Sequence, residues 1–113
     1  MEMSQAEKKL INRVSKWKEP YKSLGLQLHQ IIRETKPDLL PSSMYGMPAY
    51  RSGDTNKLIC LFRHDAKLTF SLLDDAKVTF SSGIGQIQPV AWQIDTLNDE
   101  VIKQIKDILS NIV

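Results

Sequence analysis

Hydrophobic periodicity changes twice along this chain, and these changes limit the folds that it can adopt. Apolar residues recur every three or four positions over residues 6–17 and again over residues 21–32, as on one face of a helix. Between residues 57 and 94 the apolar residues mostly alternate with polar ones, which is typical of strands. The helical period returns over residues 97–112. The chain is therefore expected to form two helices, a run of strands and a closing helix.

Capping and breaking residues indicate where these elements begin and end. The capping box Ser4-Gln5-Ala6-Glu7 predicts the start of the first helix. Pro20 suits the first position of a second helix, which we expect to end near Thr35. The segment Pro37–Pro41 is expected to be a compact connection, and Thr96 is expected to cap the last helix.

The middle of the chain predicts about five short strands joined by turns. One is expected at the segment Met44–Tyr50, and others over residues 57–63, 67–73, 77–81 and 90–94. Successive strands joined by short turns pair antiparallel. Helices on both sides of such a run indicate an α+β class, here a two-layer sandwich with an antiparallel meander, two N-terminal helices and one C-terminal helix. A chain of 113 residues fits a single domain, residues 1–113.

The segment Met44-Tyr45-Gly46-Met47-Pro48-Ala49-Tyr50 is the densest cluster of Met, Tyr, Gly and Pro in the chain. Gly46 permits a positive φ or a close approach of the backbone to a neighbour. Pro48 has no backbone N–H, so a strand here must be an edge strand or must bulge. We interpret Gly46 and Pro48 as a structural motif within a kinked edge strand. The alternative is an edge whose tyrosines and methionines contact a ligand.

A candidate binding surface follows from the two-sided apolar pattern of residues 57–63. If all helices cover one side of the sheet, Ile59 and Leu61 point to the other side. Exposed apolar patches usually mark an interface or a ligand groove, and arginines at the strand ends can hold an anionic group. The predicted binding residues are Tyr45, Met47, Tyr50, Arg51, Ile59, Leu61 and Arg63. A homodimer can cover this face. Alternatively, the C-terminal helix or the loop Ser81–Gln88 closes it within one chain.

The sequence lacks an obvious constellation for catalysis or metal binding. Cys60 is the only cysteine, and its position between apolar residues of a strand predicts a buried, inert thiol. His64 and Asp65 are adjacent and can form a pair, but no nucleophile accompanies them. His29 lies beside the apolar stripe of the second helix, where a partly buried, hydrogen-bonded side chain is expected. We therefore expect no catalytic residues, no metal site and no cofactor.

Positive charge is concentrated at the start of the chain. Residues 1–36 hold eight Lys or Arg and four Glu, a balance of +4 within a chain of net charge +2. Lys9, Arg13 and Lys16 form a stripe at helical spacing, which we interpret as a solvated face, with phosphate binding as the alternative. No aromatic platform accompanies the stripe, so no nucleic-acid partner is expected. The absence of a secretory signal, of a long apolar run and of paired cysteines predicts a cytoplasmic chain without a membrane partner.

The segment Tyr45-Gly46-Met47-Pro48-Ala49-Tyr50, together with the Thr35-Lys36-Pro37 stop before it, resembles the YdhG-like family of bacterial domains of unknown function. This resemblance implies a frataxin-like α+β sandwich, and some members of the family are discussed as iron-binding chaperones. It implies a structural or pocket-forming role for Tyr45, Gly46, Met47, Pro48 and Tyr50. Frataxin-type iron binding relies on an acidic first helix, whereas the first helix here is basic, which speaks against iron binding.

Taken together, the sequence predicts a small, non-catalytic binding domain. Its ligand is expected to be a small molecule or a protein partner, held at the sheet face near the Tyr-Gly-Met-Pro-Ala-Tyr motif. Two alternatives stay open at this point: a frataxin-like iron-binding chaperone and a small enzyme of unknown reaction.

Overall fold

A computed structural model of the chain describes residues 3–73 and 90–112. In this part of the chain, three helices and a five-stranded antiparallel sheet form an α+β structure, as the sequence predicts. The strands lie in the sheet in chain order, from β1 to β5. The elements are α1 (Gln5–Val14), α2 (Tyr21–Thr35), β1 (Leu39–Met44), β2 (Met47–Ser52), β3 (Leu58–His64), β4 (Leu68–Leu72), β5 (Ala91–Ile94) and α3 (Asp99–Ser110). The strand expected over residues 77–81 lies outside the described residues.

The helix ends follow the expected signals with three differences. Pro20 is the N-cap of α2 rather than its first residue, which is Tyr21. Ser4 caps α1 by accepting a hydrogen bond from the Glu7 amide at 3.1 Å, but the Glu7 side chain does not complete a capping box, because it turns toward α2. α2 ends at Thr35, as expected. The cap of α3 is Asn98 rather than Thr96, because the Asn98 side chain accepts from the Val101 amide at 2.9 Å.

The segment Met44–Tyr50 is a hairpin turn rather than a kink in one edge strand. Tyr45 and Gly46 have φ values of 50° and 79°, and they join β1 to β2 through the paired residues Met44 and Met47. Two positive φ values are the signature of a type I′ turn, whose twist matches that of the strands it connects. The edge strand is therefore β1, which the sequence analysis interpreted as a connection, and β2 lies inside the sheet.

Pro48 is accommodated by its place in β2. It pairs with Ser43 of β1, and the pairing of β2 with β3 begins only at the next residue, Ala49. Its missing N–H therefore interrupts no described pair with β3. A register shift follows between Tyr50 and Arg51, so the irregularity that the sequence predicts lies two residues beyond the proline.

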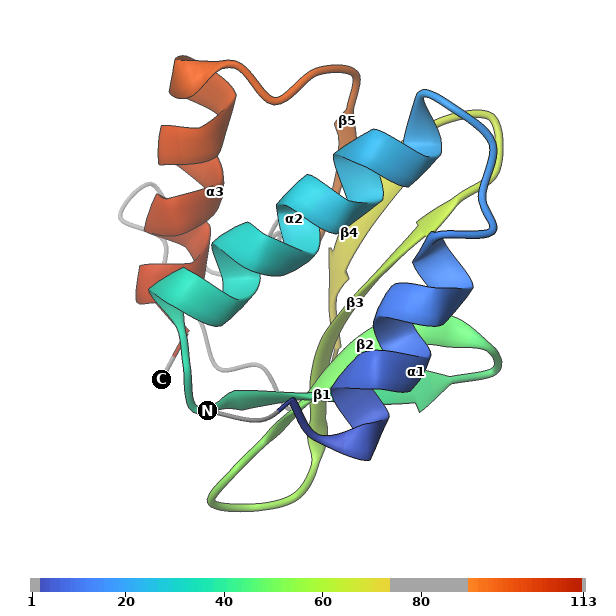
Figure 1. Cartoon of the computed structure of the whole chain (residues 1–113). Helices are drawn as coiled ribbons and strands as arrows, with labels where there is room; N and C mark the ends of the chain where they lie inside the picture. Colours follow the sequence, from blue (N-terminus) through green and yellow to red (C-terminus); the bar gives the residue numbers. More distant parts are fainter. Residues whose placement is uncertain (1–2, 74–89, 113) are drawn as a thin grey trace.

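The three helices lie on one side of the sheet, with α2 crossing between α1 and α3 (Figure 1). Cys60 and Phe62 of β3 and Phe70 of β4 point to this side and are fully buried. They join one apolar cluster with residues of all three helices, including Val14, Leu28, Ile32 and Leu109. This face matches the predicted alternation of Cys60 and Phe62.

Ile59 and Leu61 are each 5 % exposed, so they do not form the exposed apolar patch expected on the other face. Ile59 belongs to the apolar cluster with the helices, because the register shift between β2 and β3 falls at this point of β3. The exposed patch that suggested a possible homodimer is therefore absent at Ile59 and Leu61, and the homodimer itself stays a prediction from the sequence. The loop Ser81–Gln88, suggested as a cover, lies outside the described residues. Among the described helices, none is long and apolar enough to cross a bilayer.

Candidate functional site

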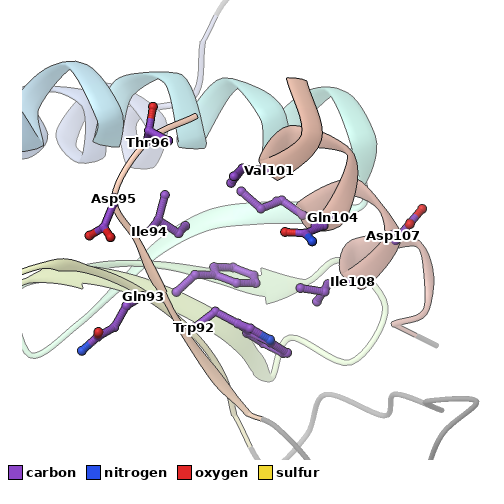
Figure 2. A pocket seen from close by; sticks show the side chains of 11 residues that line it. Trp92, Gln93, Ile94, Asp95, Thr96, Val101, Gln104, Asp107 and Ile108 are labelled. Carbon is purple, nitrogen blue, oxygen red and sulfur yellow. The ribbon is translucent and has the colours of Figure 1, made fainter. Parts of the chain in front are cut away.

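A cleft of about 600 Å³ lies between β5 and α3. Its apolar lining comes from Phe70, Trp92 and Ile94 of the sheet and from the helix side chains Val101, Ile105 and Ile108. The rings of Phe70 and Trp92 are offset-stacked, with centroids 6.0 Å apart and planes inclined by 27°. In Figure 2, Trp92 and Ile94 of β5 face Val101 and Ile108 of α3 across the hollow. The cleft is a hydrophobic space with an aromatic wall.

The cleft exists because only part of the apolar stripe of α3 packs against the rest of the protein. Ile105 and Leu109 are buried in the core, and α3 packs chiefly against α2. Val101 and Ile108 lie on the flank of the same stripe and remain only partly buried. An amphipathic helix with a broad apolar stripe normally buries it against another element. Here part of the stripe lines a hollow instead.

Polar groups are few inside the cleft and more frequent at its mouth. The carboxamide of Gln104 lies beside Ile108 on the helix side and offers both a donor and an acceptor (Figure 2). The carboxylates of Asp95 and Asp107 lie at opposite ends and point away from the hollow (Figure 2). Asp95 also pairs with Lys67, at 3.1 Å. The mouth thus carries the carboxylate of Asp107 and a charge-neutral pair of Lys67 and Asp95, and the interior is uncharged.

A buried polar network connects α1, α2 and β2. His29 Nε2 lies 2.7 Å from Glu7 Oε2, and His29 Nδ1 lies 2.6 Å from the Tyr50 hydroxyl. A carboxylate only accepts, so Nε2 carries the proton and Nδ1 accepts from the Tyr50 O–H. Arg33 Nε donates to the same Glu7 oxygen at 3.2 Å, and Arg33 Nη1 donates to the Leu39 carbonyl at 2.8 Å. His29 is therefore buried and hydrogen-bonded, as expected.

The order carboxylate, imidazole, hydroxyl resembles a relay that activates a nucleophile, but this network lacks access. The Tyr50 side chain is 0 % exposed, so no substrate reaches its oxygen. Burial lowers the pKa of His29, although the hydrogen bond and charge of Glu7 oppose that shift. Burial also raises the pKa of the Tyr50 hydroxyl. Both shifts favour neutral side chains, and the hydrogen bonds of the network tie three elements together.

Cys60 and His64 are likewise packed against other side chains of the domain. Burial raises the pKa of the Cys60 thiol to about 12, which makes it an inert side chain at neutral pH, as expected. His64 stacks on Tyr21, with ring centroids 4.8 Å apart, and meets the edge of Trp17 at 4.4 Å. The pair between His64 and Asp65 that the sequence allowed does not form in the structure, where Asp65 lies 3.8 Å from Arg63.

The residues predicted to bind a ligand do not come together. Tyr45 is 91 % exposed at the hairpin tip, whereas Tyr50, Ile59 and Leu61 are buried. Arg51 donates to Asn56 at 2.9 Å and borders a small hollow beside Glu7 and Arg33. Arg63 is exposed at the far end of β3, away from Arg51. Of the set, Met47 lines a groove against α1, which it shares with Pro48.

Sequence reasoning missed the cleft because its walls are far apart in the chain. It did identify Trp92 and Ile94 as alternating residues of one strand, and Val101 and Ile108 as members of the α3 stripe. The signal that was available is the width of that stripe, since a helix with so many apolar positions either is fully buried or borders a hydrophobic space.

No group of three or more His, Cys, Asp or Glu side chains placed to hold a metal ion occurs within residues 3–73 and 90–112. Comparisons of the chain with protein-family models, with curated proteins and with solved structures found no match. The resemblance to the YdhG-like family therefore stays a prediction from the sequence.

Proposed function

We propose that this chain is a small cytoplasmic, non-catalytic binding domain that holds a small, uncharged and largely apolar molecule in the cleft between β5 and α3. The observation that carries the proposal is the cleft itself, about 600 Å³ in volume with the stacked rings of Phe70 and Trp92 along one wall. Ligand pockets are typically about 300–1,000 Å³ and lined by apolar side chains with a few polar groups. The buried free thiol of Cys60 is consistent with a reducing compartment.

The lining favours a flat or aromatic ligand. An aromatic ring inside the cleft can pack against the wall formed by Phe70 and Trp92, and such aromatic pairs are worth about 0.5–1.5 kcal/mol beyond the area that they bury. The Gln104 carboxamide can then accept from or donate to one polar substituent. The carboxylate of Asp107 at the mouth and the lack of a cationic side chain in the described lining disfavour an anionic ligand. A molecule of about 12 non-hydrogen atoms at about −0.4 kcal/mol per atom binds with about −5 kcal/mol, a Kd of about 0.2 mM.

Binding without catalysis is supported by the side chains around the cleft. Its described lining contains no histidine, cysteine, serine or lysine, and the hydroxyl of Thr96 points away from the neighbouring carboxylate of Asp95 (Figure 2), so these two groups are not placed as nucleophile and base. The carboxylates of Asp95 and Asp107 point away from the interior of the cleft, so they do not face a molecule bound inside it (Figure 2). The proposed site differs in place from the one expected from the sequence. The Tyr-Gly-Met-Pro-Ala-Tyr motif lies at the β1 edge of the sheet, whereas the cleft lies at the β5 edge.

The proposal is tested by NMR titration of the ¹⁵N-labelled chain with p-cresol, a neutral aromatic probe. We expect saturable shifts of two side-chain signals, the Trp92 indole N–H and the Gln104 carboxamide. Ile108→Trp fills the cleft and should abolish these shifts, whereas Lys106→Ala, at an exposed position of the same helix, should preserve them. Benzoate should bind more weakly than p-cresol. Unchanged Trp92 and Gln104 signals at several millimolar p-cresol would refute the proposal.

A further inference from the structure

A second hollow, of about 280 Å³, lies between α1 and the β1–β2 hairpin. We call it the α1–hairpin groove. It is lined by Lys9 and Arg13 of α1, by the hydroxyl residues Ser42 and Ser43 of β1 and by Met47 and Pro48 of β2, with Ala6 and Leu10 behind them. A shallower hollow shares Lys9 and Arg13 and adds Asn12 and Lys16. The basic stripe noted in the sequence is exposed, as expected of a solvated face, and it also borders a concave surface.

Among residues 3–73 and 90–112, no carboxylate borders this groove to balance its positive charge. Glu7 is the only acidic residue within α1, and its carboxylate is held on another side of the helix by His29 and Arg33. The described lining of both hollows contains no Asp or Glu. Among the ion pairs of the described residues, none involves Lys9, Arg13 or Lys16. The network thus holds Glu7 away from Lys9 and Arg13, which face the groove without an ion pair to any described residue.

Arg13 is held in place within the groove. Its Nη1 donates to the Gly46 carbonyl at 2.8 Å, which ties the guanidinium to the hairpin turn while leaving further N–H donors. The turn presents that carbonyl because Tyr45 and Gly46 both adopt positive φ. A guanidinium fixed in this way loses less side-chain entropy when it binds an anion. Ser42 and Ser43 also border the groove, and Asn12 borders the shallower hollow beside it. Because consecutive strand residues point to opposite faces, one of the two serines can turn its hydroxyl into the groove.

From this arrangement we infer that the α1–hairpin groove binds a small phosphorylated molecule. Lys9 and Arg13 bind the phosphate, and Met47 and Pro48 contact the uncharged remainder of the ligand. Arg and Lys beside hydroxyl donors form the charge-assisted hydrogen bonds that phosphate oxygens accept. The groove is short and concave, which suits a small molecule better than a nucleic-acid backbone that extends along a protein surface. This inference is independent of the cleft between β5 and α3.

The test is an NMR titration of the whole chain with phenyl phosphate at low ionic strength, with phenol as the uncharged counterpart. We expect phenyl phosphate, and not phenol, to shift the backbone amides of Lys9, Arg13, Ser42 and Ser43. Added salt should weaken binding, because the contact is electrostatic and partly exposed. Loss of one charge-assisted hydrogen bond should raise the Kd at least about fivefold in Lys9→Gln and in Arg13→Gln.

Controls separate this site from general attraction to a basic protein. Lys103→Gln removes one exposed positive charge from α3 and should leave the Kd within about twofold. The Lys9 variant keeps the test decisive if Arg13→Gln disturbs the hairpin, because Lys9 makes no contact with the turn carbonyl that Arg13 binds. Equal weakening by Lys103→Gln would overturn the inference. So would equal shifts with phenol, or a single-stranded oligonucleotide that binds the same residues at least about tenfold more tightly than phenyl phosphate.

Discussion

The network of Glu7, His29 and Tyr50 makes a quantitative prediction for Tyr50→Phe. The substitution removes one hydroxyl and leaves the carbon framework of a fully buried side chain unchanged. His29 Nδ1 then loses its donor at 2.6 Å, while Nε2 remains bound to Glu7. An acceptor left buried and unsatisfied costs about 1–3 kcal/mol. For a domain of this size the melting temperature should fall by about 5–15 °C.

The assay is thermal and urea unfolding followed by circular dichroism, with Tyr45→Phe as the matched control. Tyr45 is 91 % exposed, so its variant should stay within about 0.5 kcal/mol of wild type. If Tyr50→Phe is as stable as Tyr45→Phe, the hydrogen bond carries no net stability and the reasoning is refuted. An unchanged urea m-value would show that both variants unfold from an equally compact native state.

The same network predicts how stability depends on pH. Because burial lowers the pKa of His29, the unfolded chain takes up a proton below about pH 6.5 that the folded chain resists. The contribution of this group is therefore complete above that pH and is lost as the pH falls toward the folded pKa. Urea unfolding of the wild type between pH 8 and pH 5 should show this decline, and a His29→Leu variant should show a shallower one.

Two further predictions concern the hairpin and the buried thiol. Gly46→Val should lower stability by about 1–3 kcal/mol, because a β-branched residue resists a φ of 79° and its Cβ would lie 2.9 Å from Arg13 Nη1. A Gly46→Val variant that melts within a degree or two of wild type would contradict this account of the turn. Tyr45→Asn should instead raise stability by up to about 1 kcal/mol, because Asn-Gly suits a type I′ turn. Cys60 keeps its proton in the folded chain up to about pH 12, so stability should fall by about 1.4 kcal/mol per pH unit above pH 9. Cys60→Val should remove this part of the slope, and rapid thiol labelling of the native chain at pH 8 would show that the thiol is accessible after all.

The sequence by itself determined the features that depend on neighbouring residues. The periods of three to four and of two placed the helices and strands β3, β4 and β5, and Pro37 marked the end of α2. The same local patterns placed Cys60 and Phe62 on one buried face. They failed at β1 and at the hairpin. Pro37 and Pro41 indicated a connection, although an edge strand tolerates proline. Tyr-Gly is also a weaker turn signal than Asn-Gly.

The tertiary structure decided which distant residues meet. Glu7, His29 and Tyr50 are more than twenty positions apart from one to the next, and only the packing of α1 and α2 on β2 brings them together. The cleft is formed between β5 and α3, and the α1–hairpin groove is formed between α1 and the β1–β2 hairpin. Periodicity shows which side of an element is apolar, but it does not show which element covers that side. That choice depends on the summed packing and hydrogen bonding of the whole domain, which no short stretch of sequence contains.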